Sequence, residues 1–229
     1  MENMLYISLC LLATICIYLL SLRLFNVCRQ NPLCHPLIIS CTCLIGLLYL
    51  LDFGIQNYQA NSHILVELLS LATVALGIPL YKNLKQLKQS FNIIYLPLLT
   101  GALLSPITAI LLLQLFGVDK VLVDSMVSKA ITSPIAIDIT MLTNGIPAVA
   151  VIFVILSGII GSVTATPLFN KLQIKHEMSQ GIALGVSAHA IGTARAFQIS
   201  PQCAAFSVLA MCLNGLITTI AVVLWLQII

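Results

Sequence analysis

Two short stretches in the second half of the chain decide its fold. Residues 129–140 read KAITSPIAIDIT, and residues 189–200 read HAIGTARAFQIS. They align without a gap, and the identities are Ala130/Ala190, Ile131/Ile191, Ala136/Ala196 and Ile139/Ile199. After a shift of three residues the likeness continues, because residues 154–160 read VILSGII and residues 211–217 read MCLNGLI. The second half is therefore predicted to be a duplicated unit, each copy made of a polar, breakable segment followed by a long apolar one.

The composition is that of an integral membrane protein. Of the 229 residues, 60% are hydrophobic and 7% are charged, whereas soluble domains carry about 25% charged residues. The mean hydropathy is +1.09. Apolar runs of about eighteen residues or more recur along the chain, and each is long enough to cross about 30 Å of hydrocarbon as a helix. We expect an all-α polytopic membrane protein with about six to eight transmembrane segments.

Three classes of function are not expected from these residues. The net charge of +3 is small and the basic residues are scattered, which does not indicate nucleic-acid binding. Most of the eight cysteines lie inside apolar runs as small hydrophobic side chains, and no CxxC motif occurs, so neither a metal nor another cofactor is expected. Ser187 and His189 are not part of a GxSxG motif, so the chain is not expected to be an enzyme.

Residues 1–118 are predicted to form an N-terminal membrane half with about four spans. The predicted spans are residues 4–25, 37–53, 64–84 and 93–116. Gly77 and Pro79 interrupt the third, and Pro97 and Pro106 predict kinks in the fourth. Basic loops face the cytoplasm, which places the N-terminus outside. The basic loop residues are Arg23, Arg29, Lys82, Lys85 and Lys88.

Residues 119–229 are predicted to form a C-terminal membrane half that contains the duplication, with copies at 121–169 and 178–228. Lys171 and Lys175 lie in the loop between the copies, and that loop faces the cytoplasm only if residues 121–142 enter the membrane and return. The same reasoning makes residues 178–199 a second hairpin.

A hairpin followed by one span must point the opposite way in its second copy, so the duplication is predicted to be an inverted repeat, as in many secondary transporters. The full spans are expected at about 147–169 and 203–227. Eight crossings that include two discontinuous helices fit the hydropathy equally well.

The two breaks are predicted to bind a small carboxylate. Thr132 or Ser133 can cap a new helix that has Pro134 at its first position. A second break near Gly192 lets Thr193 cap the helix that carries Arg195. Helix N-termini favour anions, and each charge at bilayer depth costs roughly 2.5–3.5 kcal/mol, which calls for a polar cavity or a partner. The candidate substrate-binding residues are Lys129, Thr132, Ser133, His189, Thr193 and Arg195, with Asn214 and Asp138 in support.

Each candidate also has a structural interpretation. Lys129 can extend to the membrane interface, and Arg195 can hold backbone carbonyls. His189 can be a neutral hydrogen-bonded residue or a proton-coupling one. Ser133, Thr193 and Asn214 can serve helix packing. Gly158, Gly161 and Gly215 are expected to let helices approach closely.

Seven stretches carry a resemblance to a known family. They are 31–33 (NPL), 72–76 (ATVAL), 79–81 (PLY), 129–136 (KAITSPIA), 189–196 (HAIGTARA), 205–207 (AFS) and 213–215 (LNG). The sequence resembles the LrgB/CidB family of bacterial inner-membrane proteins, including its YohK-like branch, and the membrane part of the plant chloroplast glycolate/glycerate translocator. It departs from the family pattern at Ala188, where a serine is common, and at Gln198 and Cys203, where acidic residues are frequent.

The resemblance implies two functions of different classes. One is a secondary transporter of small monocarboxylates of the pyruvate, glycolate and glycerate class across the bacterial inner membrane. The other is a holin/antiholin-like modulator of murein hydrolase activity and cell lysis. The resemblance also implies a small membrane protein partner of the LrgA/CidA type. The carrier class suggests a homodimer, and the other expected partners are the carboxylate and the lipid bilayer. A lysis pore does not need a cation pair at the ends of broken helices, so the residues favour the carrier.

Overall fold

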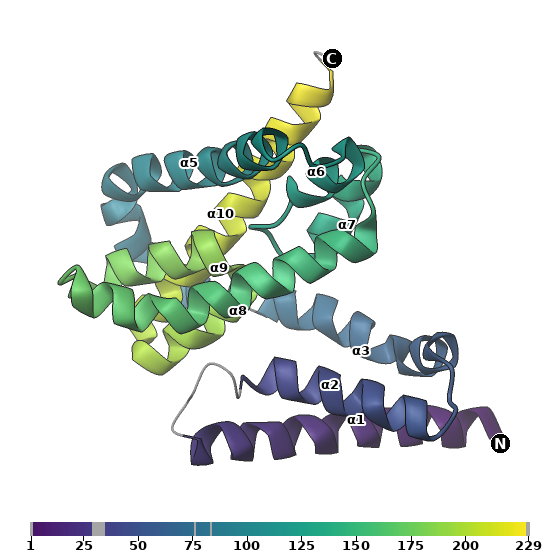
Figure 1. The fold of residues 1–229 in the computed structure, drawn as a ribbon. Coiled ribbons are helices and arrows are strands. Elements are labelled where there is room, and N and C mark those ends of the chain that lie inside the picture. The colour runs from purple at the N-terminus through teal and green to yellow at the C-terminus, as the bar shows by residue number, and fades with distance from the viewer. Residues whose placement is uncertain (1, 29–34, 76, 83, 228–229) are drawn as a thin grey trace. The chain divides into compact units, whose positions relative to one another are not determined.

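The computed structural model describes residues 2–28, 35–75, 77–82 and 84–227, and every regular element in them is an α-helix (Figure 1). The prediction of an all-helical chain is confirmed. The helices are α1 (Glu2–Val27), α2 (Pro36–Leu50), α3 (Ile55–Ala75), α4 (Gly77–Lys82), α5 (Leu84–Leu115), α6 (Lys120–Met126), α7 (Ser133–Leu142), α8 (Pro147–Lys171), α9 (Glu177–Ile199) and α10 (Pro201–Leu226). Of the stretches that carry the family resemblance, residues 31–33 and Leu76, the last residue of 72–76, lie outside the described residues.

Four helices of the described chain are long and apolar enough to cross a membrane. They contain the segments Met4–Val27, Phe91–Leu115, Pro147–Lys171 and Pro201–Leu226. These match the predicted first and fourth spans and the two full spans of the C-terminal half. Two shorter apolar helices, Pro36–Leu50 and Ser133–Leu142, are below the length of a simple span.

The chain divides into two compact units, residues 1–75 and residues 76–229. In the first unit, Tyr58 of α3 hydrogen-bonds the hydroxyl of Thr14 on α1 over 2.8 Å. The third segment was predicted to begin at residue 64, but α3 begins at Ile55, so the polar residues 56–63 are helical rather than part of a loop. The two membrane halves predicted from the sequence divide after residue 118 instead, where the repeated segments begin. This division into membrane halves stays a prediction.

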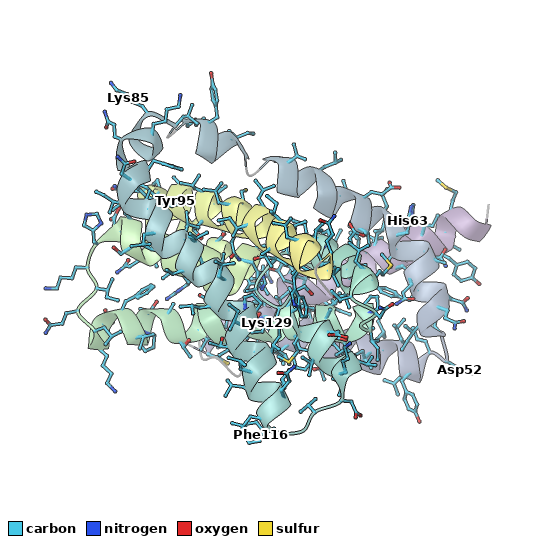
Figure 2. All side chains as sticks on the ribbon, turned by 90° about the horizontal axis from the view of Figure 1, so that it is seen from above. Asp52, His63, Lys85, Tyr95, Phe116 and Lys129 are labelled. Atoms are coloured by element: carbon cyan, nitrogen blue, oxygen red, sulfur yellow. The ribbon has the colours of Figure 1, made fainter. Side chains whose placement is uncertain are left out.

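The second unit is built on α5, α8, α9 and α10. Pro97 and Pro106 both lie inside α5, and nearby threonine hydroxyls bond to carbonyls of the same helix, Thr100 to Leu96 at 2.9 Å and Thr108 to Leu104 at 2.6 Å. One buried core cluster joins the three helices α5, α9 and α10, and it consists of Ile94, Leu98, Ile182, Val186, Phe206 and Ala210. Lys85 and Phe116 lie at the two ends of α5 in Figure 2.

The first breakable segment folds back on itself. Between α6 and α7 the chain leaves the helical conformation over residues 127–132. Ser128 and Thr140 then join their hydroxyls at 3.0 Å, and the backbone N–H of Ile146 donates to Ser125 Oγ at 2.8 Å. The end of α7 and the turn after it therefore return to the break and to the last turn of α6.

The second breakable segment is also a hairpin, although its helical pattern looks continuous. The Ser200 hydroxyl, just beyond α9, donates to Glu177 Oε2 at 2.8 Å, at the first residue of α9. A straight helix of 23 residues would be about 34 Å long, so its ends could not meet in this way. The chain turns at His189, whose φ of 40° and ψ of −127° are not helical.

The second break was predicted near Gly192 and Thr193, and that position is wrong. Gly192 lies within the second half of α9, where the absence of a side chain lets it pack on the other half. A Cβ at Gly192 would collide with the carbonyl oxygen of Leu184 and would lie 2.6 Å from the Ala188 side chain. The glycine therefore serves close packing between the two halves, and the turn itself lies three residues earlier.

Candidate functional site

The break of the first hairpin is held in place by α8 and α10. The Ser157 hydroxyl on α8 donates to the backbone carbonyl of Lys129 at 2.7 Å. The side-chain amide of Asn214 on α10 donates to the carbonyl of Ala130 at 2.7 Å. Carbonyls that lost their helical partners at the break are thereby satisfied by side chains from two neighbouring helices.

Lys129 lies half-buried beside α5, inside the second unit (Figure 2). Its ammonium donates to the Ser105 hydroxyl at 3.3 Å. Among the residues that the structure describes, no carboxylate lies within 4.0 Å of this ammonium. Asp138, the predicted nearby acid, is exposed on α7. The positive charge is thus held mainly by neutral groups, and an anion beside it would be stabilised.

His189 forms the apex of the second hairpin and is 2% exposed. Its Nε2 lies 2.9 Å from the carbonyl oxygen of Val154 on α8. A carbonyl oxygen only accepts, so Nε2 carries the proton and donates it. A backbone with φ of 40° is costly for a residue with a side chain, and such strain is typical of functional sites.

The two breaks meet at one turn of α8. The Val154 carbonyl accepts from His189, and the Ser157 hydroxyl, three residues on, lies 2.7 Å from the Lys129 carbonyl and 2.9 Å from the Val154 carbonyl. Lys129 and His189 occupy the same position in the two repeats. The structure therefore brings together the two residues that the sequence alignment pairs.

The start of α7 lies at the first break. Thr132 is its N-cap residue and Pro134 lies within its first two positions, as predicted. The Thr132 hydroxyl, however, makes no capping hydrogen bond and is buried without a partner. Ser133 is the first helical residue and is half-buried. The N–H groups of this first turn add a partial positive charge on the side of Lys129.

Arg195 lies farther from the breaks than the sequence suggested. Its guanidinium donates to Gln198 Oε1 at 2.6 Å and to the Thr166 hydroxyl on α8 at 3.0 Å. Thr166 follows Ser157 by nine residues, which is about 14 Å along a helix. The backbone of Lys129 and the guanidinium of Arg195 are therefore anchored at different levels of α8.

Thr193 does not cap a helix, and this part of the prediction is wrong. Because the break lies at His189, Thr193 is one turn inside the second half of α9. Its hydroxyl lies 2.8 Å from the His189 carbonyl, to which it donates, and 2.9 Å from Ser207 Oγ on α10. Thr193 is 1% exposed and fastens this half of the hairpin to α10.

Sequence reasoning missed the partners that hold these residues. Ser105, Ser157 and Thr218 contact or adjoin the first break, and none was singled out. For Ser157 a signal existed, because the repeat alignment places it opposite Asn214. Ser105 carries no local sequence signal, since only the packing of α5 brings it to Lys129.

The site offers donors and a positive charge rather than a metal-binding set. Among the described residues, no group of three or more His, Cys, Asp or Glu side chains is placed to hold a metal ion. Lys129 and the first turn of α7 instead provide charge and N–H donors of the kind that bind an anion.

Comparison with known proteins identifies the family. Residues 14–228 match the model of the LrgB-like family. The chain is 33% identical to YwbG of Bacillus subtilis (strain 168) over 186 residues, which cover 81% of this chain and 83% of that protein. It is 28% identical to the holin-like protein CidB of Staphylococcus epidermidis (strain ATCC 12228 / FDA PCI 1200) over 222 residues, which cover 97% and 96% of the two chains.

The holin-like protein CidB of Staphylococcus aureus (strain N315) is 28% identical over 214 residues, 93% of each chain. No solved structure matches the chain. The family model and these relatives, together with the four candidate spans, make this a multi-pass bacterial membrane protein. The chain belongs to the LrgB-like family.

Proposed function

We propose that the protein is a secondary transporter of small monocarboxylates, of the pyruvate, glycolate and glycerate class, across the bacterial inner membrane. The observation that carries the proposal is the meeting of the two breaks at Val154 and Ser157, with the Lys129 ammonium half-buried beside them. Burying a cation inside a membrane protein is costly, and such residues usually serve a substrate path.

In this proposal the two hairpins enter the membrane and return on the side from which they came. The support is geometric: the turn after α7 returns to the last turn of α6, where Thr143 donates to the Asp124 carbonyl at 3.2 Å and the Ile146 N–H donates to Ser125 Oγ at 2.8 Å, and Glu177 and Ser200 join the two ends of α9. Non-helical backbone at membrane depth is tolerated where protein or a cavity surrounds it, as the contacts from α8 and α10 provide.

The substrate carboxylate binds in this scheme at the first break. Lys129 supplies the charge, and Thr132 and Ser133 supply hydroxyl donors at the start of α7. His189 lies at the matching position of the second break. Arg195, about 14 Å away along α8 by the helical rise, is a second anion contact on the path between the break and one membrane face.

The arrangement of the spans supports alternating access. Gly158, in the span of the first repeat, packs on His189 of the second hairpin, and Gly215, in the span of the second repeat, packs on Ile135 of the first hairpin. Each span therefore contacts the hairpin of the other copy. In inverted-repeat carriers, rocking of one such unit against the other exposes a fixed site to each side in turn.

Uptake into proteoliposomes tests the proposal. We expect saturable uptake of labelled pyruvate or glycolate by the wild-type protein, and a loss of at least about tenfold in Lys129→Gln, since one charge-assisted hydrogen bond is worth about 1.5–3 kcal/mol. Lys171→Gln is the matched control, because Lys171 is exposed in the last turn of α8. Undiminished uptake in both Lys129→Gln and Arg195→Gln would reject these assignments.

A second candidate function is a holin-like role in murein hydrolase regulation and lysis. The observation that favours it is the name of the CidB relatives, which are called holin-like proteins. These relatives match nearly the full length of this chain. The same proteoliposomes separate the two functions when they are loaded with carboxyfluorescein. A pore releases the dye without saturation, whereas a carrier retains it. Co-expression with a small membrane protein of the LrgA/CidA type tests whether either activity needs that partner.

A further inference from the structure

A cavity of about 640 Å³ lies at the base of the first hairpin, inside the second unit. Its walls come from the C-terminal end of α5, from α6, from the turn after α7 and from the last turn of α10. Residues 127–132, which form the first break, are not among those that line it. The cavity is therefore not part of the candidate site at the breaks and requires an explanation of its own.

The cavity lies at one face of the membrane. Of the candidate spans, the one in α5 ends at Leu115 and the one in α10 ends at Leu226. Gln114 of α5 and Trp225 of α10 both line the cavity, so these two spans end at the same face. Tryptophan is enriched at the boundary between water and hydrocarbon. The cavity is thus at the depth of the lipid headgroups.

Two opposite charges line the cavity without pairing. Lys120 and Asp124 lie four residues apart on α6, the spacing at which charged side chains commonly pair on a helix. In the part of the chain that the structure describes, however, no carboxylate lies within 4.0 Å of the Lys120 ammonium. The bond that holds Asp124 in place uses its backbone carbonyl, which accepts from the Thr143 hydroxyl at 3.2 Å. The two charged groups are therefore available to a ligand.

The other polar side chains of the wall are neutral. Gln114 and Asn144 are exposed amides, and Thr143 is a buried hydroxyl. Amide and hydroxyl oxygens accept hydrogen bonds from an ammonium, as the Asp124 carboxylate does. Trp225 adds an aromatic ring, and the face of such a ring attracts a cation. The wall is therefore rich in groups that suit an ammonium.

We propose that this cavity binds the headgroup of a zwitterionic aminophospholipid, in which a short carbon chain joins a primary ammonium to a phosphate. Asp124 accepts from the ammonium, with Gln114 and Asn144 as further acceptors. Lys120 donates to the phosphate. Both contacts are charge-assisted hydrogen bonds, which are the strong ones in proteins.

The same wall disfavours other ligands. A monocarboxylate or an anionic headgroup brings negative charge close to Asp124, which repels it. A quaternary ammonium has no N–H group to donate, and proteins bind it in cages of several aromatic rings. Among the described residues of this wall, Trp225 alone is aromatic. The wall therefore favours a primary ammonium paired with a phosphate.

A bound headgroup joins parts of the protein that are far apart in the sequence. Lys120 and Asp124 belong to the start of the first hairpin, and Asn144 belongs to the turn at its end. Gln114 and Trp225 belong to two spans. The lipid therefore braces the base of the hairpin against α5 and α10. The inference goes beyond the proposed function, because a carrier and a holin-like protein could each hold a lipid in this way.

The fluorescence of Trp225 tests the proposal directly, because it is the single tryptophan of the chain. The full-length protein is reconstituted in phosphatidylcholine bilayers that contain a second lipid brominated near the top of its acyl chains, since bromine quenches tryptophan on contact. The brominated lipid is phosphatidylethanolamine, phosphatidylcholine or phosphatidylglycerol. We expect the ethanolamine lipid to bind beside Trp225 about tenfold more strongly than either of the others, the factor that one charge-assisted hydrogen bond provides.

Asp124→Asn is the decisive variant, and Asp119→Asn is its matched control. Each removes one carboxylate from the same segment. Asp119 is exposed, makes no capping hydrogen bond at the start of α6 and does not line the cavity. We expect the preference for the ethanolamine lipid over the choline lipid to disappear in Asp124→Asn and to be unchanged in Asp119→Asn. Lys120→Gln should weaken quenching by both of these lipids.

Three results would overturn the proposal. The first is equal quenching by the three lipids in the wild-type protein, and the second is a preference that survives Asp124→Asn. The third is no quenching by any lipid, since protein would then cover the cavity. Soluble glycerophosphoethanolamine separates a free ligand from a lipid. A change in Trp225 emission on its addition, without a preference for the brominated ethanolamine lipid, would assign the same chemistry to a soluble ligand and overturn the lipid.

Discussion

The side-chain amide of Asn214 joins the two hairpins by donating to the Ala130 carbonyl in the first break, at 2.7 Å, and to the Val186 carbonyl near the second, at 3.3 Å. One side chain of α10 therefore ties both broken segments together. On α8, Ser157 and Val154 do the same for Lys129 and His189. The two breaks thus form one structural unit, and changes at either one should be felt at the other.

The contact between α8 and the second break predicts unequal effects at two equivalent glycines. A Cβ at Gly158 would lie 2.7 Å from both His189 Cε1 and Ile191 Cδ1, whereas a Cβ at Gly215 meets only Ile135 Cδ1, at 3.3 Å. We expect Gly158→Ala to lower the free energy of unfolding by about 1–3 kcal/mol. Gly215→Ala should leave it within about 1 kcal/mol, because the flexible end of Ile135 can move.

Thermal unfolding of the purified protein in detergent measures both glycine variants. Since the two positions are equivalent in the repeat, each serves as the control for the other. A Gly158→Ala protein as stable as Gly215→Ala would contradict the close packing of His189 on α8.

The conformation of His189 predicts an order of stability between two truncations. His189→Ala and His189→Gly both remove the imidazole and its bond to Val154. Only glycine adopts a φ of 40° without strain. The glycine variant should therefore be more stable than the alanine variant by about 1–2 kcal/mol, the usual cost of left-handed backbone for other residues. A denaturation series on both proteins checks this order, and an alanine variant equal to or more stable than the glycine one would show that the apex is not strained.

The sequence located the elements well where the signal was local. Four long apolar segments are helices at nearly the predicted residues, and Pro134 marks the start of α7 because proline suits the first turn of a helix. The sequence places the second break three residues too late, because glycine commonly marks a helix break. The role of Gly192 is tertiary, since it packs on Leu184, and nothing in the sequence around His189 indicates a turn.

The repeat alignment predicted which two residues pair at the breaks better than it predicted the positions of the other candidate residues. The repeat alignment paired Lys129 with His189, and the structure brings both to one turn of α8. Arg195 was expected at the same depth, but six residues separate it from the true break, so it is bonded to Thr166 instead. The positions of Ser105 and Thr218 depend on how α5 and α10 pack, which no local pattern records.

The bond between Thr193 and Ser207 predicts a stabilising role for a residue that was first considered as a ligand. Thr193→Val would leave the buried Ser207 hydroxyl without this partner and remove the bond to the His189 carbonyl. We expect the free energy of unfolding to fall by about 1–3 kcal/mol, and Thr193→Ser, which keeps the hydroxyl, to lose less. Thr164→Val is the control, because the Thr164 hydroxyl is exposed and bonds only within α8. Equal stability of Thr193→Val and Thr164→Val would contradict this role.

The bond between Glu177 and Ser200 predicts which side of the membrane each end of α9 faces. If the α9 hairpin is re-entrant, cysteines introduced at His176 and Gln202, in a protein whose native cysteines are replaced, react with a membrane-impermeant maleimide from the same side. If α9 spanned the membrane instead, the two cysteines would react from opposite sides. The measurement is labelling of intact cells against labelling of inverted vesicles.

The helix α8 provides the internal control for this experiment. It is 25 residues long and is a candidate span, and a helix needs about 20 residues to cross the membrane. Asn144 is exposed just before the start of α8, and Lys171 is exposed at its last residue. Cysteines at these two positions should therefore react from opposite sides. Same-side labelling of the α9 pair in a protein with opposite-side labelling of the α8 pair would support a re-entrant hairpin. Opposite-side labelling of both pairs would exclude the hairpin, and with it the inverted repeat on which the carrier mechanism depends.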